Sequence, residues 1–194
     1  VTRTHTGTLT FSGTGSGKTI SAGQALAATG GININGIDAS WALSAGLTNN
    51  STVSLINGSL DTAGFTLSLS TLAVPTETWG GTPRTLSLGA STVTSSAANG
   101  GINFASSTST TNPVNFTLNA GTSTITLAGT GTQFYHAGKP FHNVALTESS
   151  PASTLNLNHS IFTPTFNNFT ITTASSTGLK TAVLSCNLII NGTF

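Results

Sequence analysis

The sequence carries very little charge. Of its 194 residues only five are Lys or Arg and four are Asp or Glu, which is 5% of the chain against about 25% in ordinary soluble domains. Five cations cannot form the basic field that neutralises nucleic-acid phosphates, so we expect no nucleic-acid partner. The net charge of +1 and the mean hydropathy of +0.18 also differ from the composition of disordered chains, which combine high charge with low hydropathy.

Cysteine and long apolar runs are equally scarce. The single cysteine, Cys186, excludes an internal disulfide framework. The longest apolar runs, such as residues 188–190, are far shorter than the roughly 18 residues of a membrane span, so we expect no membrane insertion. The residues that build helical bundles and coiled coils are also in short supply. The first residues do not have the pattern of a secretory leader, and we interpret the chain as a processed product or a segment of a longer chain.

Small hydroxyl side chains take the place of charge. The chain has 38 threonines and 25 serines, which alternate with apolar residues in short runs such as 65–70, 85–88, 116–119 and 124–127. Alternation with a period of two places one set of side chains on each face of a strand, and β-branched residues favour strands. Gly and Asn separate the runs, as turns require. The sequence therefore predicts an all-β fold with apolar residues inward and hydroxyls outward.

The chain also resembles itself. Residues 6–15 resemble residues 122–131, and residues 57–65 resemble the final four residues. Imperfect repetition of short strands predicts a parallel β-helix, or β-solenoid, in one domain over residues 1–194. At roughly 20 residues per rung and about 4.8 Å between rungs, we expect about nine or ten rungs. An antiparallel β-sandwich or jelly roll is the alternative. Residues 73–85 concentrate Pro, Trp and charge, and are predicted to form a loop-like insertion.

Several of these segments are similar to those of the β-strand-repeat proteins. The similarity lies in residues 57–67, 84–94, 116–127, 141–146 and 166–171, and it extends over residues 50–194. Such proteins occur in the fibres, tails and head appendages of tailed phages and on bacterial surfaces. The resemblance implies a β-solenoid with a structural or adhesive role, located outside the cell on a virion or cell surface, and it supplies no catalytic motif.

We therefore expect a non-enzymatic structural protein without a cofactor or bound metal. Its expected partners are further copies of itself, in an oligomer or filament that covers the strand edges at the ends, or other virion and surface proteins. Three alternatives stay open. They are a polysaccharide-binding or depolymerising protein like a tailspike, a pilin-like filament subunit that donates a strand, and an ice-binding solenoid with Thr-x-Thr segments such as 122–126.

Aromatic side chains mark the best candidate for a binding site. Sugars stack on Trp or Tyr beside polar groups, and Trp79 stands with Glu77 and Arg84 in the predicted insertion. Trp41 and Tyr135 are weaker candidates for the same cell-surface glycan. The competing interpretation is that Trp41 and Trp79 cap the apolar core.

Two other patterns imitate functional motifs. Residues 12–19 imitate a phosphate-binding loop, but Ser12 replaces its first glycine and no good helix former follows, so we predict a glycine-rich turn. His136, His142 and Glu148 recur at a spacing of six, as metal ligands on one strand would. Because residues 138–140 interrupt that strand, we interpret the histidines as turn or surface residues. Asp61 is predicted to bond its own turn.

Overall fold

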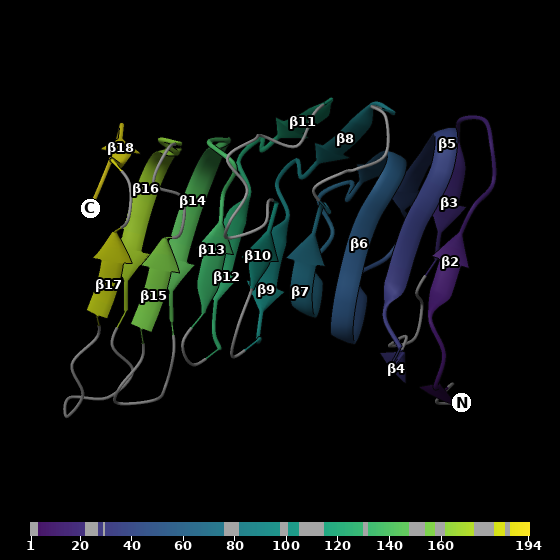
Figure 1. Ribbon diagram of the computed structural model, residues 1–194, viewed down its shortest axis with the longest axis horizontal. Helices are drawn as coiled ribbons and strands as arrows, with labels where there is room; N and C mark the ends of the chain where they lie inside the picture. Colours follow the sequence, from purple (N-terminus) through teal and green to yellow (C-terminus); the bar gives the residue numbers. More distant parts are fainter. Residues whose placement is uncertain are drawn as a thin grey trace.

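The computed structural model describes residues 4–21, 27–28, 30–75, 82–97, 101–104, 115–129, 132–147, 154–157, 162–172, 181–184 and 187–194. These ranges contain strands and turns and no helix, so none of them holds a helix that could cross a membrane. Every strand pairing in them is parallel. The predicted all-β solenoid is confirmed (Figure 1). The alternative of an antiparallel β-sandwich or jelly roll is wrong.

Most strands are short, apart from β5 and β6 with 12 and 15 residues, and the chain passes through the strands in one repeating order. They are β1 (Thr4–His5), β2 (Leu9–Phe11), β3 (Lys18–Ile20), β4 (Ala27–Ala28), β5 (Ile32–Leu43), β6 (Leu47–Asp61), β7 (Leu67–Ala73), β8 (Arg84–Ser87), β9 (Thr92–Ser95), β10 (Ile102–Asn103), β11 (Phe116–Asn119), β12 (Thr124–Leu127), β13 (Gln133–Tyr135), β14 (Pro140–Leu146), β15 (Thr154–Leu157), β16 (Thr165–Ile171), β17 (Thr181–Leu184) and β18 (Ile189–Ile190).

Strand pairing from rung to rung builds three faces along the rod. Face A contains the beginnings of β6 and β7, then β9, β12 and the ends of β14 and β16. Face B contains β2, the beginning of β5, the middle of β6, the end of β7, and β10, β13, β15 and β17. Face C contains β3, the ends of β5 and β6, β8 and β11, and then the beginnings of β14 and β16 with β18.

The rungs are unequal in length, which corrects the expectation of a nearly constant repeat. The stretch of chain from Val93 to its partner Ile125 is much longer than the stretch from Ile125 to its next partner, Val144. The internal resemblance does not follow the rungs either. In residues 6–15 the matching strand, β2, lies on face B, whereas in residues 122–131 it is β12 on face A. The similar segments therefore share a strand pattern without occupying equivalent positions.

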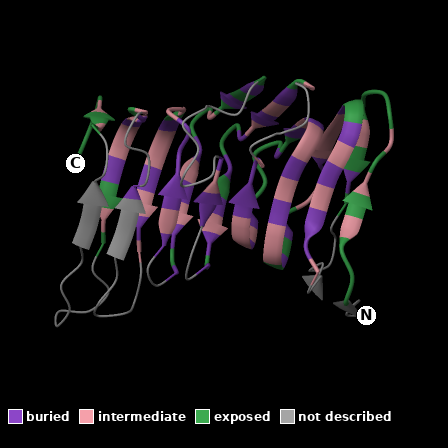
Figure 2. Cartoon of the chain, viewed as in Figure 1, coloured by how far each residue is buried: buried purple, intermediate pink, exposed green. Residues whose placement is uncertain are grey.

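The core runs the length of the rod between the three faces. Inward side chains are buried and alternate with partly or fully exposed outward ones along β8, β11 and β12 (Figure 2). On face A one buried column consists of Leu47, Leu67, Val93, Ile125, Val144 and Phe169. Burial of such side chains contributes roughly 1.5–3 kcal/mol each, and is the main force that holds rung to rung.

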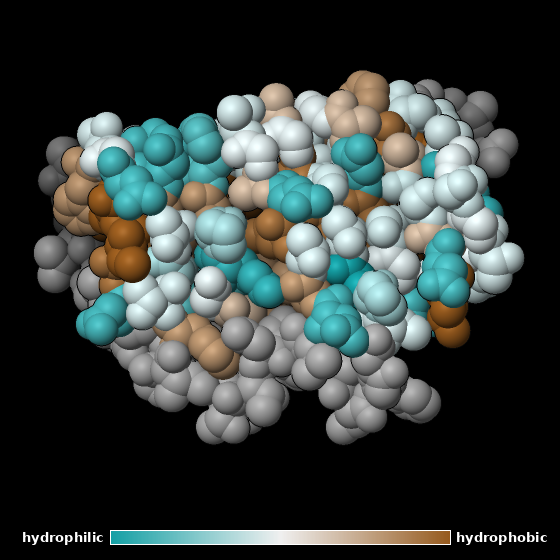
Figure 3. All heavy atoms as spheres, turned by 90° about the horizontal axis from the view of Figure 1, so that it is seen from above, coloured by the Kyte–Doolittle hydropathy of each residue, from teal (hydrophilic) through white to brown (hydrophobic). Residues whose placement is uncertain are grey.

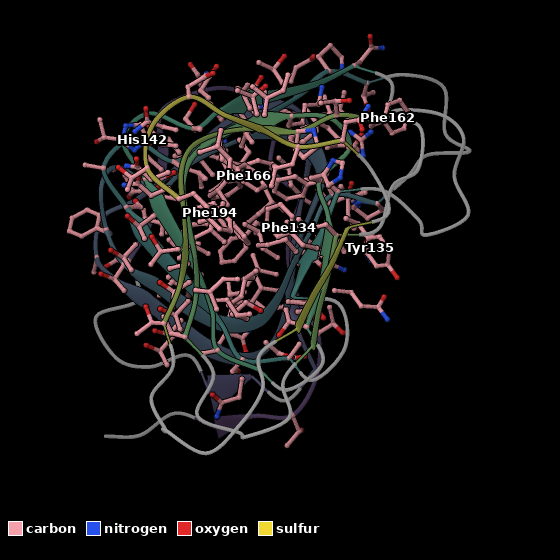
Figure 4. The ribbon with its side chains drawn as sticks, turned by 90° about the vertical axis from the view of Figure 1, so that its left-hand side faces the viewer. Phe134, Tyr135, His142, Phe162, Phe166 and Phe194 are labelled. Atoms are coloured by element: carbon pink, nitrogen blue, oxygen red, sulfur yellow. The ribbon has the colours of Figure 1, made fainter. Side chains whose placement is uncertain are left out.

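Phenylalanine dominates the core of the C-terminal half. Figure 4 shows Phe134 and Phe166 inside the ring of strands when the rod is viewed from its C-terminal end. The Phe134 ring centroid lies 4.9 Å from that of Phe141 and 5.9 Å from that of Phe166. All three side chains are buried. Edge-on and tilted ring pairs of this kind stabilise by about 0.5–1.5 kcal/mol beyond their buried area.

Tight turns carry the chain from face C to face A. The N–H of Ser91 donates to the carbonyl of Leu88 at 3.0 Å, and that of Ser123 donates to the carbonyl of Ala120 at 3.2 Å. Gly89 and Gly121 follow the acceptors with φ of 55° and 60°. The N–H of Thr122 donates to the carbonyl of Gly89 at 2.8 Å, so the two turns stack directly on each other.

Amide side chains form ladders along the rod. Asn57 donates from Nδ2 to Oδ1 of Asn35 at 2.6 Å, and Asn168 donates in the same way to Asn143 at 2.8 Å. An amide has both a donor and an acceptor, so identical side chains on successive rungs satisfy one another. These ladders add side-chain bonds to the backbone bonds between rungs.

The predicted insertion at 73–85 connects face B to face C. β7 ends at Ala73 and β8 begins at Arg84, so Arg84 belongs to a strand and not to the loop. Residues 76–81 lie outside the described part of the chain.

Candidate functional site

The residues predicted to bind a sugar are not brought together by the described strands. Trp41 lies in β5 and Arg84 in β8, both on face C, whereas Tyr135 lies in β13 on face B. Glu77 and Trp79 lie outside the described residues. The described candidates therefore do not form a single site.

Arg84 is buried instead of facing the solvent. Only 1% of its surface is exposed, because it has the same inward position in β8 as Leu86. Its Nη1 donates to the carbonyl oxygen of Pro75 at 2.6 Å. This hydrogen bond connects the beginning of the insertion to β8. The guanidinium does not lie on the surface, where sugar binding would require it.

Trp41 and Tyr135 are both packed against neighbours. The Trp41 ring lies edge-on to Phe11, with centroids 5.2 Å apart, and the Nζ of Lys18 lies 5.7 Å from its centroid. Tyr135 is 8% exposed and its hydroxyl donates to Oε1 of Gln133. Tyr135 is therefore almost completely covered, whereas Trp41 keeps part of its surface exposed although its ring packs on Phe11.

The glycine-rich turn at residues 12–17 binds its own lysine. The Nζ of Lys18 donates to the carbonyl of Thr14 and, at 3.1 Å, to that of Gly15. A phosphate-binding loop points backbone N–H groups at its ligand, whereas this turn points carbonyls at a cation. The predicted turn between β2 and β3 is confirmed.

Two ionisable side chains in the described part of the chain, Asp61 and His136, accept hydrogen bonds within turns. Oδ1 of Asp61 accepts from the N–H of Ala63 at 2.7 Å, as predicted. His136 is buried, and its Nδ1 accepts from the N–H of Gly138 at 3.0 Å. His142 lies partly buried between faces C and A (Figure 4), and Glu148 is outside the described residues. No three His, Cys, Asp or Glu residues gather as metal ligands within the described ranges.

The outward side of face A is a regular polar surface. Thr92 and Thr94 of β9 lie directly beside Thr124 and Thr126 of β12, because these strands pair without a register shift. We call this surface the hydroxyl face. It consists of the outward residues Thr48, Ser68, Thr92, Thr94, Thr124, Thr126, Asn143, Ala145, Asn168 and Thr170.

The hydroxyl face has a regular geometry and no charge. Its residues form two columns, with rungs about 4.8 Å apart and columns about 6.6 Å apart. Asn143 donates from Nδ2 to Oγ1 of Thr124 at 3.4 Å and accepts from Asn168, so one column is joined by side-chain bonds. Each hydroxyl or amide can donate and accept. Such a surface matches a ligand that presents evenly spaced hydroxyls or water molecules.

By comparison, the upper surface of the rod is not covered by one continuous polar or apolar patch. Figure 3 shows teal, light and brown residues interspersed over it, with brown at the left-hand end near the C-terminus and also in the middle and toward the right. Ile189 and Phe194 are the exposed large apolar side chains described at that end.

Sequence reasoning missed the alignment that makes the hydroxyl face. Thr-x-Thr segments are visible in the sequence, but threonine is so common that no segment stands out. The signal is the alignment of β9 with β12 across the long loop between them, which only strand pairing reveals.

Comparisons with protein-family models, with curated proteins and with solved structures find no match for this chain.

Proposed function

We propose that this chain is a non-enzymatic structural and adhesive rod, part of a phage virion appendage or of a bacterial surface fibre. The observation that carries the proposal is the uninterrupted run of parallel rungs on face A, with an apolar core inside and an uncharged hydroxyl face outside. Contacts between successive rungs stabilise such a rod, and its outer surface remains available for binding to other molecules.

The location and partners follow from the same proposal. The rod is extracellular, on a virion or cell surface, and it assembles with further copies or with other structural proteins. Low charge supports close packing, because neighbouring rods do not repel one another.

Gold-labelled antibodies against the chain should decorate particle appendages or cell surfaces in electron micrographs. Label confined to the cell interior would contradict the assignment.

A glycan on the cell surface is the proposed ligand for adhesion, with Trp79 as the predicted stacking residue. We expect Trp79→Ala to weaken adsorption of the labelled protein to bacterial cells by about tenfold, which corresponds to about 1.4 kcal/mol. Arg84 is left unchanged, because its burial means that replacing it would disturb the fold. Trp41→Phe, which keeps a packed ring, is the control, and equal adsorption by Trp79→Ala and wild type would exclude this site.

A polysaccharide depolymerase is the enzymatic alternative. Glycoside hydrolysis usually requires two carboxylates at the scissile bond. In the described residues Asp61 is engaged in its turn, which favours adhesion without cleavage. Incubation with purified capsular polysaccharide separates the two, since adhesion leaves the chain length of the polymer unchanged and a depolymerase shortens it.

Ice binding is a second candidate, which the register of the hydroxyl face favours. The paired Thr-x-Thr segments of β9 and β12 can order water in two regular columns. If this candidate holds, the protein shows thermal hysteresis, and Thr126→Lys abolishes it by placing a charged, bulky side chain in the array. Thr19→Lys, on face C, should leave it unchanged. Absence of hysteresis in the wild type would rule out the candidate.

A further inference from the structure

Face C is interrupted between two neighbouring rungs. β11 pairs with β8 over residues 116–119 and with no other described strand. The first two residues of β14, Pro140 and Phe141, pair only with β16 on the next rung among the described strands. Figure 1 accordingly shows β8 and β11 together at the top, apart from the upper ends of β14 and β16. The edge of β11 that faces β14 therefore has no strand partner among the described residues.

Backbone groups of Phe116 and Leu118 point into this interruption. The carbonyls of Asn115 and Asn119 accept from β8 and its following residue, at 2.8 Å from the N–H of Arg84 and 2.9 Å from that of Leu88. Successive residues of a strand direct their N–H and C=O groups to opposite sides. The intervening residues Phe116 and Leu118 thus present theirs on the side away from β8, where an added strand would bind.

Lys139 occupies this side of β11. Its Nζ donates to the carbonyl oxygen of Phe116 at 2.7 Å and lies 5.2 Å from the centroid of the Phe116 ring. A tight turn holds it there, with the N–H of Lys139 donating to the carbonyl of His136 at 3.0 Å and with Ala137 and Gly138 in the left-handed region. Burial lowers the pKa of the Lys139 amine below its ordinary value. An incoming strand would have to displace this ammonium or bury its charge. Either change raises the free energy of the associated state.

We propose that Lys139 seals the edge of β11 against the addition of a strand from a second copy of the chain. A second copy is the fitting occupant because its Thr- and Ser-rich strands carry almost no charge, so no like-charge repulsion opposes pairing. A charged lysine on an open edge is a common device against such association. The inference does not depend on the proposed function.

The test removes the charge and measures association. Lys139→Met keeps an unbranched stem over the Phe116 ring, and we expect about a doubling of the sedimenting mass relative to wild type at equal concentration. Lys139→Arg, which keeps the charge, should sediment as wild type. Lys18→Met is the matched control, because Lys18 also donates to carbonyls, but in a turn and not at a strand edge. Association through the ends of the rod should be the same in wild type and variants, so the difference in sedimenting mass reports only the effect of residue 139.

Hydrogen exchange locates the new contact. In associated Lys139→Met the N–H of Leu118 should exchange more slowly than in wild type, because an added strand accepts its hydrogen bond. A folded Lys139→Met that sediments as wild type overturns the proposal, and so does association without protection at Leu118. Lys139→Gln, which is also neutral, is expected to associate and supplies the same test if the methionine variant does not fold.

Discussion

Replacing Phe134 with alanine is expected to lower the free energy of unfolding by about 3–5 kcal/mol. The side chain is fully buried, and its ring packs against those of Phe141 and Phe166. Alanine leaves a cavity between three successive rungs, since Phe134 lies between Ile102 and Leu157 in register. Denaturant unfolding followed by circular dichroism measures the loss.

The loss should also be local. Each rung of a solenoid contacts only its neighbours, so faster hydrogen exchange is expected first in β10, β13 and β15. Thr126→Ala, an outward change in the same rung, is the control and should alter stability by no more than about 0.5 kcal/mol. If Phe134→Ala and Thr126→Ala cost the same, the phenylalanine core does not have the role described for it.

Gly121→Ala is expected to have the second large effect. A Cβ at this position would lie 2.3 Å from the carbonyl oxygen of Gly89, which is backbone and cannot turn away. The left-handed φ of 60° adds about 1–2 kcal/mol of strain, and the forced separation of the two stacked turns adds about 1–3 kcal/mol. Thermal unfolding measures the sum.

Gly64→Ala separates these two contributions. Gly64 has a φ of 80°, but a Cβ there would meet nothing within 4 Å. It should therefore cost only the conformational strain, and the excess for Gly121→Ala reports the stacking of turns. Equal costs for the two variants would mean that the rungs adjust freely at this corner.

Much of this architecture could be predicted from the sequence, because it follows from local pattern. Alternation in residues 116–119 and 124–127 correctly assigns inward and outward side chains, and the Gly-containing turns fall between strands. The pairing of strands could not be predicted, since it depends on how much chain leaves the rod at each corner. The local sequence pattern does not distinguish the long rung that begins at Val93 from the short rung that begins at Ile125. The length of each rung nevertheless decides which residues of the later strands pair with one another.

The candidate sites were harder to predict for a related reason. The charged and aromatic residues near Arg84 in the sequence suggest an exposed site. Its exposure is instead set by the alternation of inward and outward side chains along β8, which places Arg84 on the inward side with Leu86. Lys139 belongs to no recognisable motif, because its role depends on β11, a strand of the preceding rung. The hydroxyl face likewise exists only through the pairing of β9 with β12.

The interruption of face C also has a mechanical consequence. Strands run across the long axis in Figure 1, so tension along the rod acts on the bonds between rungs in series. At the junction of the β9–β11 rung with the next, only faces A and B carry backbone pairing among the described strands, and face B contributes two residue pairs there. We expect a stretched rod to separate first between these two rungs. The segments on either side would keep their folded structure.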